Sequence, residues 1–228
     1  MEALQAHGRL TVSGVRITAK RLIAELYPKN RFEPLWTDQR KVDDLLRAIA
    51  ESRLDGLDPQ DYYLDPLTKL RAEYEASPEV GKQVDLDILM TDALARLAYN
   101  AFFGKVDPER IDPNINVNQH WRGARGAEGV REFLASKSLY DKIDGLKPQR
   151  PKYQQFRDAL ARYRRYEAAG GWSRIPKGKV LSVGRNDPRV PAIRHRLAVT
   201  EDLPTNLDNG SKLYDDCLLY TSPSPRDL

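Results

Sequence analysis

The fold is decided by residues 86–101, which read LDILMTDALARLAYNA. The apolar side chains in this stretch recur at steps of three and four over about four turns, which places them on one face of an α-helix. They are Leu86, Leu89, Met90, Ala93, Leu94, Leu97 and Ala101. Because this is the strongest helical signal in the chain, the sequence predicts that a helix over 86–101 forms the centre of the core.

Capping residues predict further helices on both sides of this stretch. Thr37 or Asp38 can accept a hydrogen bond from the first backbone amides of a helix, and Gly56 can supply the left-handed stop that ends it. Five Asp-Pro pairs repeat a related pattern, in which the aspartate caps a helix and the proline occupies its first position. These pairs begin at Asp58, Asp65, Asp107, Asp112 and Asp187. The sequence therefore predicts an all-α fold with a multi-helix domain over most of the chain.

The composition excludes several classes of protein. The chain has 228 residues, of which 31% are charged, and a mean hydropathy of −0.63. No stretch of about 18 consecutive apolar residues is present, so no membrane segment is predicted, and the first residues lack the charged head and apolar run of a secretory signal. The single cysteine, Cys217, excludes an intrachain disulfide, and three scattered histidines give no reason to expect a metal site or a cofactor.

The sequence also lacks the patterns of known catalytic sites. A cysteine nucleophile needs a neighbouring base, usually histidine, and donors for the oxyanion. Cys217 follows Asp215 and Asp216 and has no histidine near it in the sequence. No glycine-rich phosphate loop, paired-histidine helix or Gly-x-Ser-x-Gly motif occurs. We therefore assign no catalytic residue.

Residues 152–165, KYQQFRDALARYRR, predict a basic helix, which is the candidate for nucleic-acid binding. Aromatic residues interleave with its arginines, as in surfaces on which bases stack. They are Tyr153, Phe156, Tyr163 and Tyr166. Most of them share a face with Ala159 and Leu160, where they are expected to serve packing. Since 33 acidic residues nearly balance 37 basic ones in the whole chain, a solvated basic face is favoured over a nucleic-acid interface.

The pattern changes at residues 170–203, GGWSRIPKGKVLSVGRNDPRVPAIRHRLAVTEDL. Turn-forming residues recur every few positions up to Gly184, and a short helix follows. Asp187 is predicted as its N-cap and Pro188 as its first residue. The apolar side chains Val190, Ile193 and Leu197 recur at helical spacing. This stretch predicts a linker followed by a second, smaller helical module.

The same stretch resembles the joint between the scaffold and the peptidoglycan-binding module of the long bacterial L,D-transpeptidases. The likeness is carried by Gly-Gly-Trp at 170–172, Ile-Pro-x-Gly at 175–178, Asp-Pro-Arg-Val at 187–190 and the ending Leu-x-x-Thr-x-Asp-Leu at 197–203. Upstream blocks resemble that family's scaffold domain in the family's order. They read ELYPKNRFEPLWTD, AIAESRLDGLDPQDYYL, LMTDALARLAYNAFFGKVDP and YQQFRDALARYRRYEAAGGW. The resemblance covers about residues 14–216.

The resemblance implies a domain order. Residues 1–13 would be an N-terminal extension, 14–169 the helical scaffold domain, and 170–216 a linker and part of a small helical peptidoglycan-binding module. Residues 217–228 depart from the family pattern. From Leu218 the sequence LLYTSPSPRDL abandons helical periodicity, so this tail is expected to be extended, disordered or foreign.

The resemblance also implies a function, namely the noncatalytic scaffold and wall-binding part of a peptidoglycan-crosslinking enzyme. The family's catalytic domain carries a Ser-His-Gly-Cys motif, which does not occur here, so the chain is expected to be inactive alone and to need that domain in cis. The parent protein would be periplasmic, although the expected signal or anchor does not occur in this sequence. The predicted peptidoglycan contacts are Trp172, which can stack on a sugar, and Arg189 and Arg194, which can pair with stem-peptide carboxylates. The alternative is a basic helical module that binds nucleic acid through residues 152–165.

Overall fold

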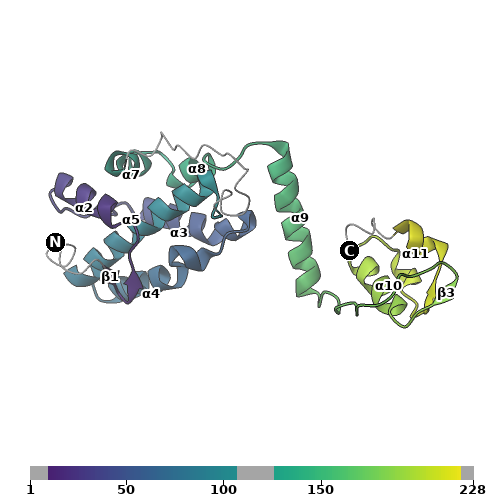
Figure 1. Cartoon of the computed structure of the whole chain (residues 1–228). Helices are drawn as coiled ribbons and strands as arrows, with labels where there is room; N and C mark the ends of the chain where they lie inside the picture. The colour runs from purple at the N-terminus through teal and green to yellow at the C-terminus, as the bar shows by residue number, and fades with distance from the viewer. Residues whose placement is uncertain (1–9, 107–125, 222–228) are drawn as a thin grey trace. The chain divides into compact units, whose positions relative to one another are not determined.

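Helix α5, Val80–Phe103, lies at the centre of the first part of the chain (Figure 1). The structure is a computed structural model that describes residues 10–106 and 126–221. Leu89, Met90 and Ala93 of α5 are fully buried, which confirms the predicted apolar stripe. The helix packs against α2 (Lys20–Lys29), α3 (Gln39–Glu51), α4 (Leu64–Ala76), α7 (Ala127–Leu134) and α8 (Leu139–Asp144). These helices together enclose the main apolar core.

The all-α fold predicted from the sequence is confirmed. The residues that the structure describes contain nine α-helices and four strands of only two residues each. The strands form two antiparallel pairs, β1 (Thr11–Val12) with β2 (Val15–Arg16) and β3 (Arg185–Asn186) with β4 (Leu213–Tyr214). The 3-10 helices η1 (Ser52–Asp55) and η2 (Pro59–Tyr62) connect α3 to α4. Within the described ranges no helix is long and apolar enough to cross a membrane.

The chain folds as two compact units, unit 1 with residues 1–154 and unit 2 with residues 155–228. Helix α9 (Pro151–Ala168) contributes its first four residues to unit 1 and the others to unit 2. Unit 2 also contains β3, β4, α10 (Val190–Val199), the 3-10 helix η3 (Thr205–Leu207) and α11 (Asp216–Thr221). The structural division thus lies within α9, before the boundary at Gly170 that the resemblance implies. The functional boundary at Gly170 stays a prediction.

Unit 2 has a small apolar core of its own. Its buried members are Val190, Leu197, Leu203, Tyr214 and Leu218. Residues 217–221 belong to α11 instead of being extended, because Leu218 is fully buried in this core. Residues 222–228 lie outside the described ranges, so the origin of the tail stays a prediction.

Three of the predicted helix signals are confirmed. Asp38 caps α3, and its carboxylate accepts a hydrogen bond from the backbone amide of Arg40 at 3.0 Å. Asp58 caps η2 in the same way. Gly56 ends η1 with a φ of 77°, a left-handed conformation that glycine adopts without steric cost. Two further predicted caps, Asp107 and Asp112, lie outside the described residues.

The other two predicted caps are wrong. Asp65 lies inside the first turn of α4, because the chain turns at Tyr63, which has a left-handed φ of 63° and is the N-cap of that helix. Asp187 lies before α10, whose N-cap is Arg189. Its carboxylate accepts a hydrogen bond from the backbone amide of Arg189 at 2.9 Å, so it closes a turn ahead of the helix.

Candidate functional site

Trp172, the first predicted contact residue, belongs to an aromatic cluster in unit 2. Gly170 and Gly171, with φ values of 108° and 58°, end α9 and turn the chain so that Trp172 returns to the helix. The Trp172 ring lies 6.5 Å from the ring of Tyr163 in an edge-to-face arrangement. Tyr163 in turn lies 5.7 Å from Tyr166. Trp172 is half-buried, so part of the indole is accessible to a ligand.

A cation completes this cluster. The guanidinium carbon of Arg196 lies 5.5 Å from the centre of the Trp172 ring, within the range of a cation–π contact. The hydroxyl of Tyr166 donates to the carbonyl of Thr200 at 3.4 Å, which ties α9 to the end of α10. We refer to Tyr163, Tyr166, Trp172 and Arg196 as the Trp172 cluster. It combines an aromatic face with a positive charge, the two groups that a carboxylate-bearing sugar would use.

Arg189, the second predicted contact, is engaged inside unit 2. Its guanidinium makes a two-point ion pair with Asp187, at 2.9 and 3.0 Å, and donates to the carbonyl of Lys179 at 2.6 Å. These hydrogen bonds lower the pKa of Asp187 to about 2. A Cβ atom on Gly178 would clash with the Arg189 guanidinium, so the loop backbone passes very close to this side chain. Arg189 therefore holds the loop before α10 in place.

Arg194, the third predicted contact, is only 2% exposed. It donates to the carboxylate of Asp215 at 2.6 Å and to the carbonyls of Leu213 and Leu207 at 3.0 and 3.2 Å. Desolvation raises the pKa of Asp215, but hydrogen bonds from Arg194 and the Leu218 amide outweigh it and lower that pKa below its ordinary value. Since this guanidinium offers no surface to a ligand, Arg194 is omitted from the contact set proposed below.

Of the three predicted residues, Trp172 and Arg189 are half-buried and Arg194 is buried, and the Arg189 guanidinium is already paired with Asp187. Their contact with peptidoglycan stays a prediction. The sequence contained a signal for the burial of Arg194, because it lies four residues after Val190 and three before Leu197, on the apolar face of α10. Arg196 lies off that face and reaches Trp172. Arg196 was missed because its partner lies 24 positions earlier in the sequence.

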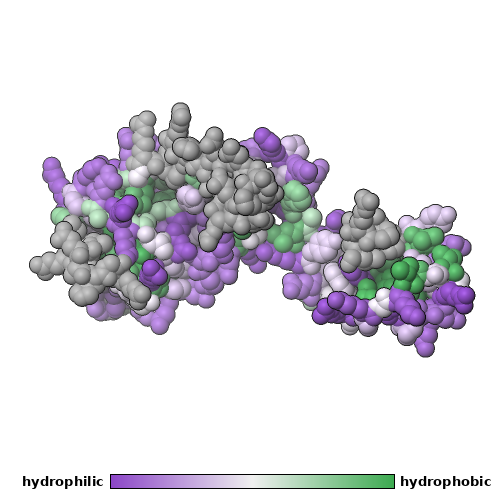
Figure 2. Space-filling view, in the orientation of Figure 1, coloured by the Kyte–Doolittle hydropathy of each residue, from purple (hydrophilic) through white to green (hydrophobic). Residues whose placement is uncertain are grey.

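Helix α9 differs from its predicted packing. Phe156 is 66% exposed and Tyr163 is 51% exposed, whereas the apolar stripe predicts that both are packed. Only Tyr166 of the helix is buried, at 8% exposure. Figure 2 shows an apolar patch over the middle of α9, with hydrophilic residues next to it. The stripe was identified correctly from its period, but periodicity does not say whether another element covers it.

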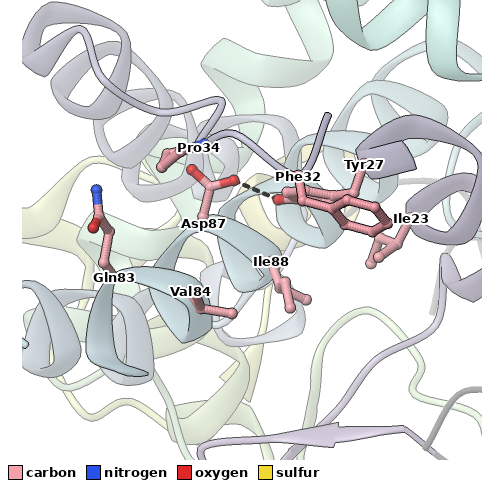
Figure 3. A pocket seen from close by; sticks show the side chains of 8 residues that line it. All are labelled: Ile23, Tyr27, Phe32, Pro34, Gln83, Val84, Asp87 and Ile88. Carbon is pink, nitrogen blue, oxygen red and sulfur yellow. Dashed lines mark hydrogen bonds between the residues drawn. The ribbon is translucent and has the colours of Figure 1, made fainter. Parts of the chain in front are cut away.

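Unit 1 contains a separate cavity of about 300 Å³ between α2 and α5 (Figure 3). The residues that line it are Ile23, Tyr27, Phe32, Pro34, Gln83, Val84, Asp87 and Ile88. At its floor the Tyr27 hydroxyl donates to the Asp87 carboxylate at 2.5 Å. Burial, followed by the charge of Asp87, raises the pKa of Tyr27 above its usual value. Burial likewise raises the pKa of Asp87, against the hydrogen bonds that it accepts.

Asp87 has a structural role at this floor. Besides Tyr27, its carboxylate accepts hydrogen bonds from the backbone amides of Leu35 and Trp36, each at 2.9 Å. One turn and a half further along α5, the fully buried Asp92 accepts from the backbone amides of Thr18 and Ala19 at 3.0 and 2.5 Å. These two acids therefore fasten the segments before and after α2 to the central helix. The sequence signal for them was an acid within the most apolar helical stretch, which needs a partner when buried.

The described residues show no metal-binding arrangement. Within residues 10–106 and 126–221, no group of three His, Cys, Asp or Glu side chains is placed to hold a metal ion. The thiol of Cys217 is exposed on α11.

Comparison with known proteins gives one match. Residues 21–160 match the Scaffold domain family, which is the scaffold of L,D-transpeptidases. A search of curated proteins and a search of solved structures found no match. The matched residues run from α2 into α9, lie within the predicted scaffold range of 14–169, and make up more than half of the chain. The chain therefore belongs to the Scaffold domain family of the L,D-transpeptidases.

Proposed function

We propose that this chain is the noncatalytic scaffold and wall-binding part of a periplasmic L,D-transpeptidase, an enzyme that crosslinks peptidoglycan. The observation that carries the proposal is the Scaffold domain match over residues 21–160. The bond-forming cysteine would come from a catalytic domain in cis, since the Ser-His-Gly-Cys motif does not occur in residues 1–228. In the sequence Cys217 follows Asp215 and Asp216 and has no histidine near it, the base that most often activates a thiol nucleophile.

Two features of unit 2 support a wall-binding role. The unit has its own apolar core, so it can present a surface independently of the scaffold helices. The half-buried ring of Trp172, with the Arg196 guanidinium over one of its faces, combines an apolar aromatic surface with a positive charge. Sugar rings of peptidoglycan can stack on such a face, and the carboxylates of its stem peptides can pair with the guanidinium.

The test is cosedimentation of the purified full chain with peptidoglycan sacculi, with cellulose as the control polysaccharide. The chain is expected to sediment with sacculi and to remain in solution with cellulose. Incubation with sacculi is expected to form no new crosslinks, because the chain supplies no activated thiol. A chain that remains in solution with sacculi, or that forms crosslinks by itself, would contradict the proposal.

The second candidate function is nucleic-acid binding through α9, favoured by the exposed Phe156 and Tyr163 among its arginines. Binding to phosphates releases counterions, so its affinity falls steeply as salt is added. Single-stranded DNA binding that is tight at low salt and lost at physiological salt, without retention on sacculi, would favour this candidate.

A further inference from the structure

Helix α9 exposes two large aromatic side chains on one face. Phe156 and Tyr163 leave 66% and 51% of their surfaces in solvent, although aromatic side chains usually contribute most when buried. Between them lies the half-buried Leu160, so the three form a continuous apolar stripe on a helix that is otherwise mostly polar. Exposed apolar surface of this kind, rimmed by polar residues, marks binding sites in soluble proteins.

The geometry of the stripe matches a repeating, ring-shaped ligand. Seven residues separate Phe156 from Tyr163, so the two rings share a helix face and lie about 10.5 Å apart along the axis. This separation is close to the length of two linked pyranose rings. A glycan strand that runs along α9 would therefore place equivalent sugars of successive disaccharides on the two aromatic side chains.

The stripe is continuous with the Trp172 cluster. Tyr163 is a member of both, and its ring contacts the ring of Trp172, which lies beside the guanidinium of Arg196. A ligand that follows α9 from Phe156 would thus reach a second apolar face and then a positive charge. The Arg162 and Arg165 side chains of α9 are also exposed.

The charge of unit 2 is complementary to an anionic ligand. Residues 155–228 contain 13 Lys and Arg against 9 Asp and Glu, whereas residues 1–154 contain 24 of each. The net charge of +4 is therefore located entirely in unit 2. The excess is modest, and Glu167 lies on the stripe face four residues after Tyr163. A nucleic acid, with one phosphate per nucleotide, is bound best by a strongly positive groove along its backbone, while a glycan with uncharged rings between carboxylates needs fewer cations.

From these observations we infer that the α9 stripe of Phe156, Leu160 and Tyr163, continued by Trp172 and Arg196, is the docking surface for a carboxylate-bearing glycan strand. The inference rests on the proposed wall-binding function, and it extends the contact surface from Trp172 and Arg196 to residues of α9 that precede Gly170. Phe156 and Tyr163 supply stacking, and Arg196 supplies a partner for carboxylates. Leu160 fills the space between the two rings.

The test compares full-length variants in their affinity for sacculi, chitin and single-stranded DNA. Phe156→Ala and Tyr163→Ala are each expected to weaken binding to sacculi about three- to tenfold, as expected for loss of one aromatic contact. Arg196→Gln is expected to weaken binding to sacculi but to leave binding to chitin, an uncharged glycan, unchanged. Phe32→Ala and Tyr220→Ala are matched controls, since they remove aromatic side chains that are 62% and 86% exposed elsewhere.

The outcomes separate this inference from the function on which it rests. If the wild-type chain binds sacculi and the Phe156→Ala, Tyr163→Ala double variant binds equally well, the docking surface is elsewhere and the wall-binding function stands. If the wild-type chain does not bind sacculi, both fail. If the variants lose binding to DNA alone, the stripe serves nucleic acid. A thermal unfolding midpoint identical to that of wild type excludes misfolding of a variant. If Tyr163→Ala does not fold, Phe156→Ala alone tests whether the stripe binds the glycan.

Discussion

Replacement of Asp92 by alanine is predicted to destabilise unit 1 by about 3 kcal/mol. The carboxylate of Asp92 accepts from the amides of Thr18 and Ala19, at the start of α2, and from the hydroxyl of Tyr63 at 2.7 Å. Loss of the acceptor leaves the Thr18 and Ala19 amides, which immediately precede α2, without their partner, and this costs about 1–2 kcal/mol. The hydroxyls of Thr18 and Tyr63 lose the same acceptor, although Tyr63 can still donate to the carbonyl of Arg16 at 3.2 Å, and this loss costs about 1–2 kcal/mol more.

The isosteric change Asp92→Asn separates these two contributions. The remaining carbonyl oxygen can still accept from the amides, whereas the new NH2 group faces the Tyr63 hydroxyl, which must then donate to the carbonyl of Arg16 instead. The predicted cost is therefore about 1 kcal/mol, close to the loss of the Tyr63 hydrogen bond alone. Asp85→Ala is the matched control, because Asp85 is a partly exposed acid of the same helix whose partner, Ser13, lies at the surface. Its predicted cost is within about 0.5 kcal/mol.

The assay is guanidinium chloride unfolding followed by tryptophan fluorescence. A Trp172→Phe background confines the signal to Trp36 and Trp121, so the transition reports residues 1–154 only. The free energy of unfolding comes from the midpoint and the slope of that transition. If Asp92→Ala proves as stable as Asp85→Ala, the reasoning that α2 depends on this buried carboxylate is refuted.

Three other predictions concern unit 2. Because Arg189 lowers the pKa of Asp187 to about 2, ionised Asp187 stabilises the unit above about pH 4, and this contribution is lost as the pH falls toward 2. The thermal midpoints of wild type and Asp187→Asn should therefore differ at pH 5 and converge at pH 2. An equal difference between the two midpoints at both pH values would contradict the ion pair between Asp187 and Arg189. Gly178→Ala should lower the thermal midpoint in wild type but much less in an Arg189→Ala background, because the three atoms nearest to its Cβ all belong to the Arg189 guanidinium. Additive effects of the two substitutions would show that the clash is elsewhere. Leu218→Ala should lower the free energy of unfolding by about 2–4 kcal/mol because it leaves a cavity in the small core, whereas Leu219→Ala should be near neutral because Leu219 is 48% exposed. Equal protease resistance of the two variants would show that α11 does not contribute to the core.

The helices of unit 1 were largely predictable because their signals are local. The apolar period of residues 86–101 specifies both the helix and its buried face, and Asp38 and Gly56 act on amides within a few residues. The failures involved the same local signals in competition with distant contacts. Asp187 has the sequence of a cap, but Arg189 and the loop at Gly178 fix it in a turn ahead of α10.

The candidate site was predictable only in part, because binding depends on which side chains remain uncovered. Trp172 could be chosen from its type and its position after two glycines. The choice between Arg194 and Arg196 required knowing which side of α10 faces the core, and the spacing from Val190 contained that information. The exposure of Phe156 and Tyr163 could not be derived from the sequence, because an apolar stripe has the same period whether or not another element packs on it.

The two buried acids of α5 also constrain the length of the segment that contains α2. Asp87 and Asp92 lie five residues apart on a rigid helix, about 7.5 Å along its axis, and each fastens one end of the segment from Ala19 to Leu35. The number of residues between these two points is therefore constrained as closely as their identity. A single inserted or deleted residue within the segment moves one end off its acid, whereas length changes in the exposed turn at Ser77 and Pro78 disturb neither. Natural variation in the length of this scaffold should be confined to the chain outside these anchors.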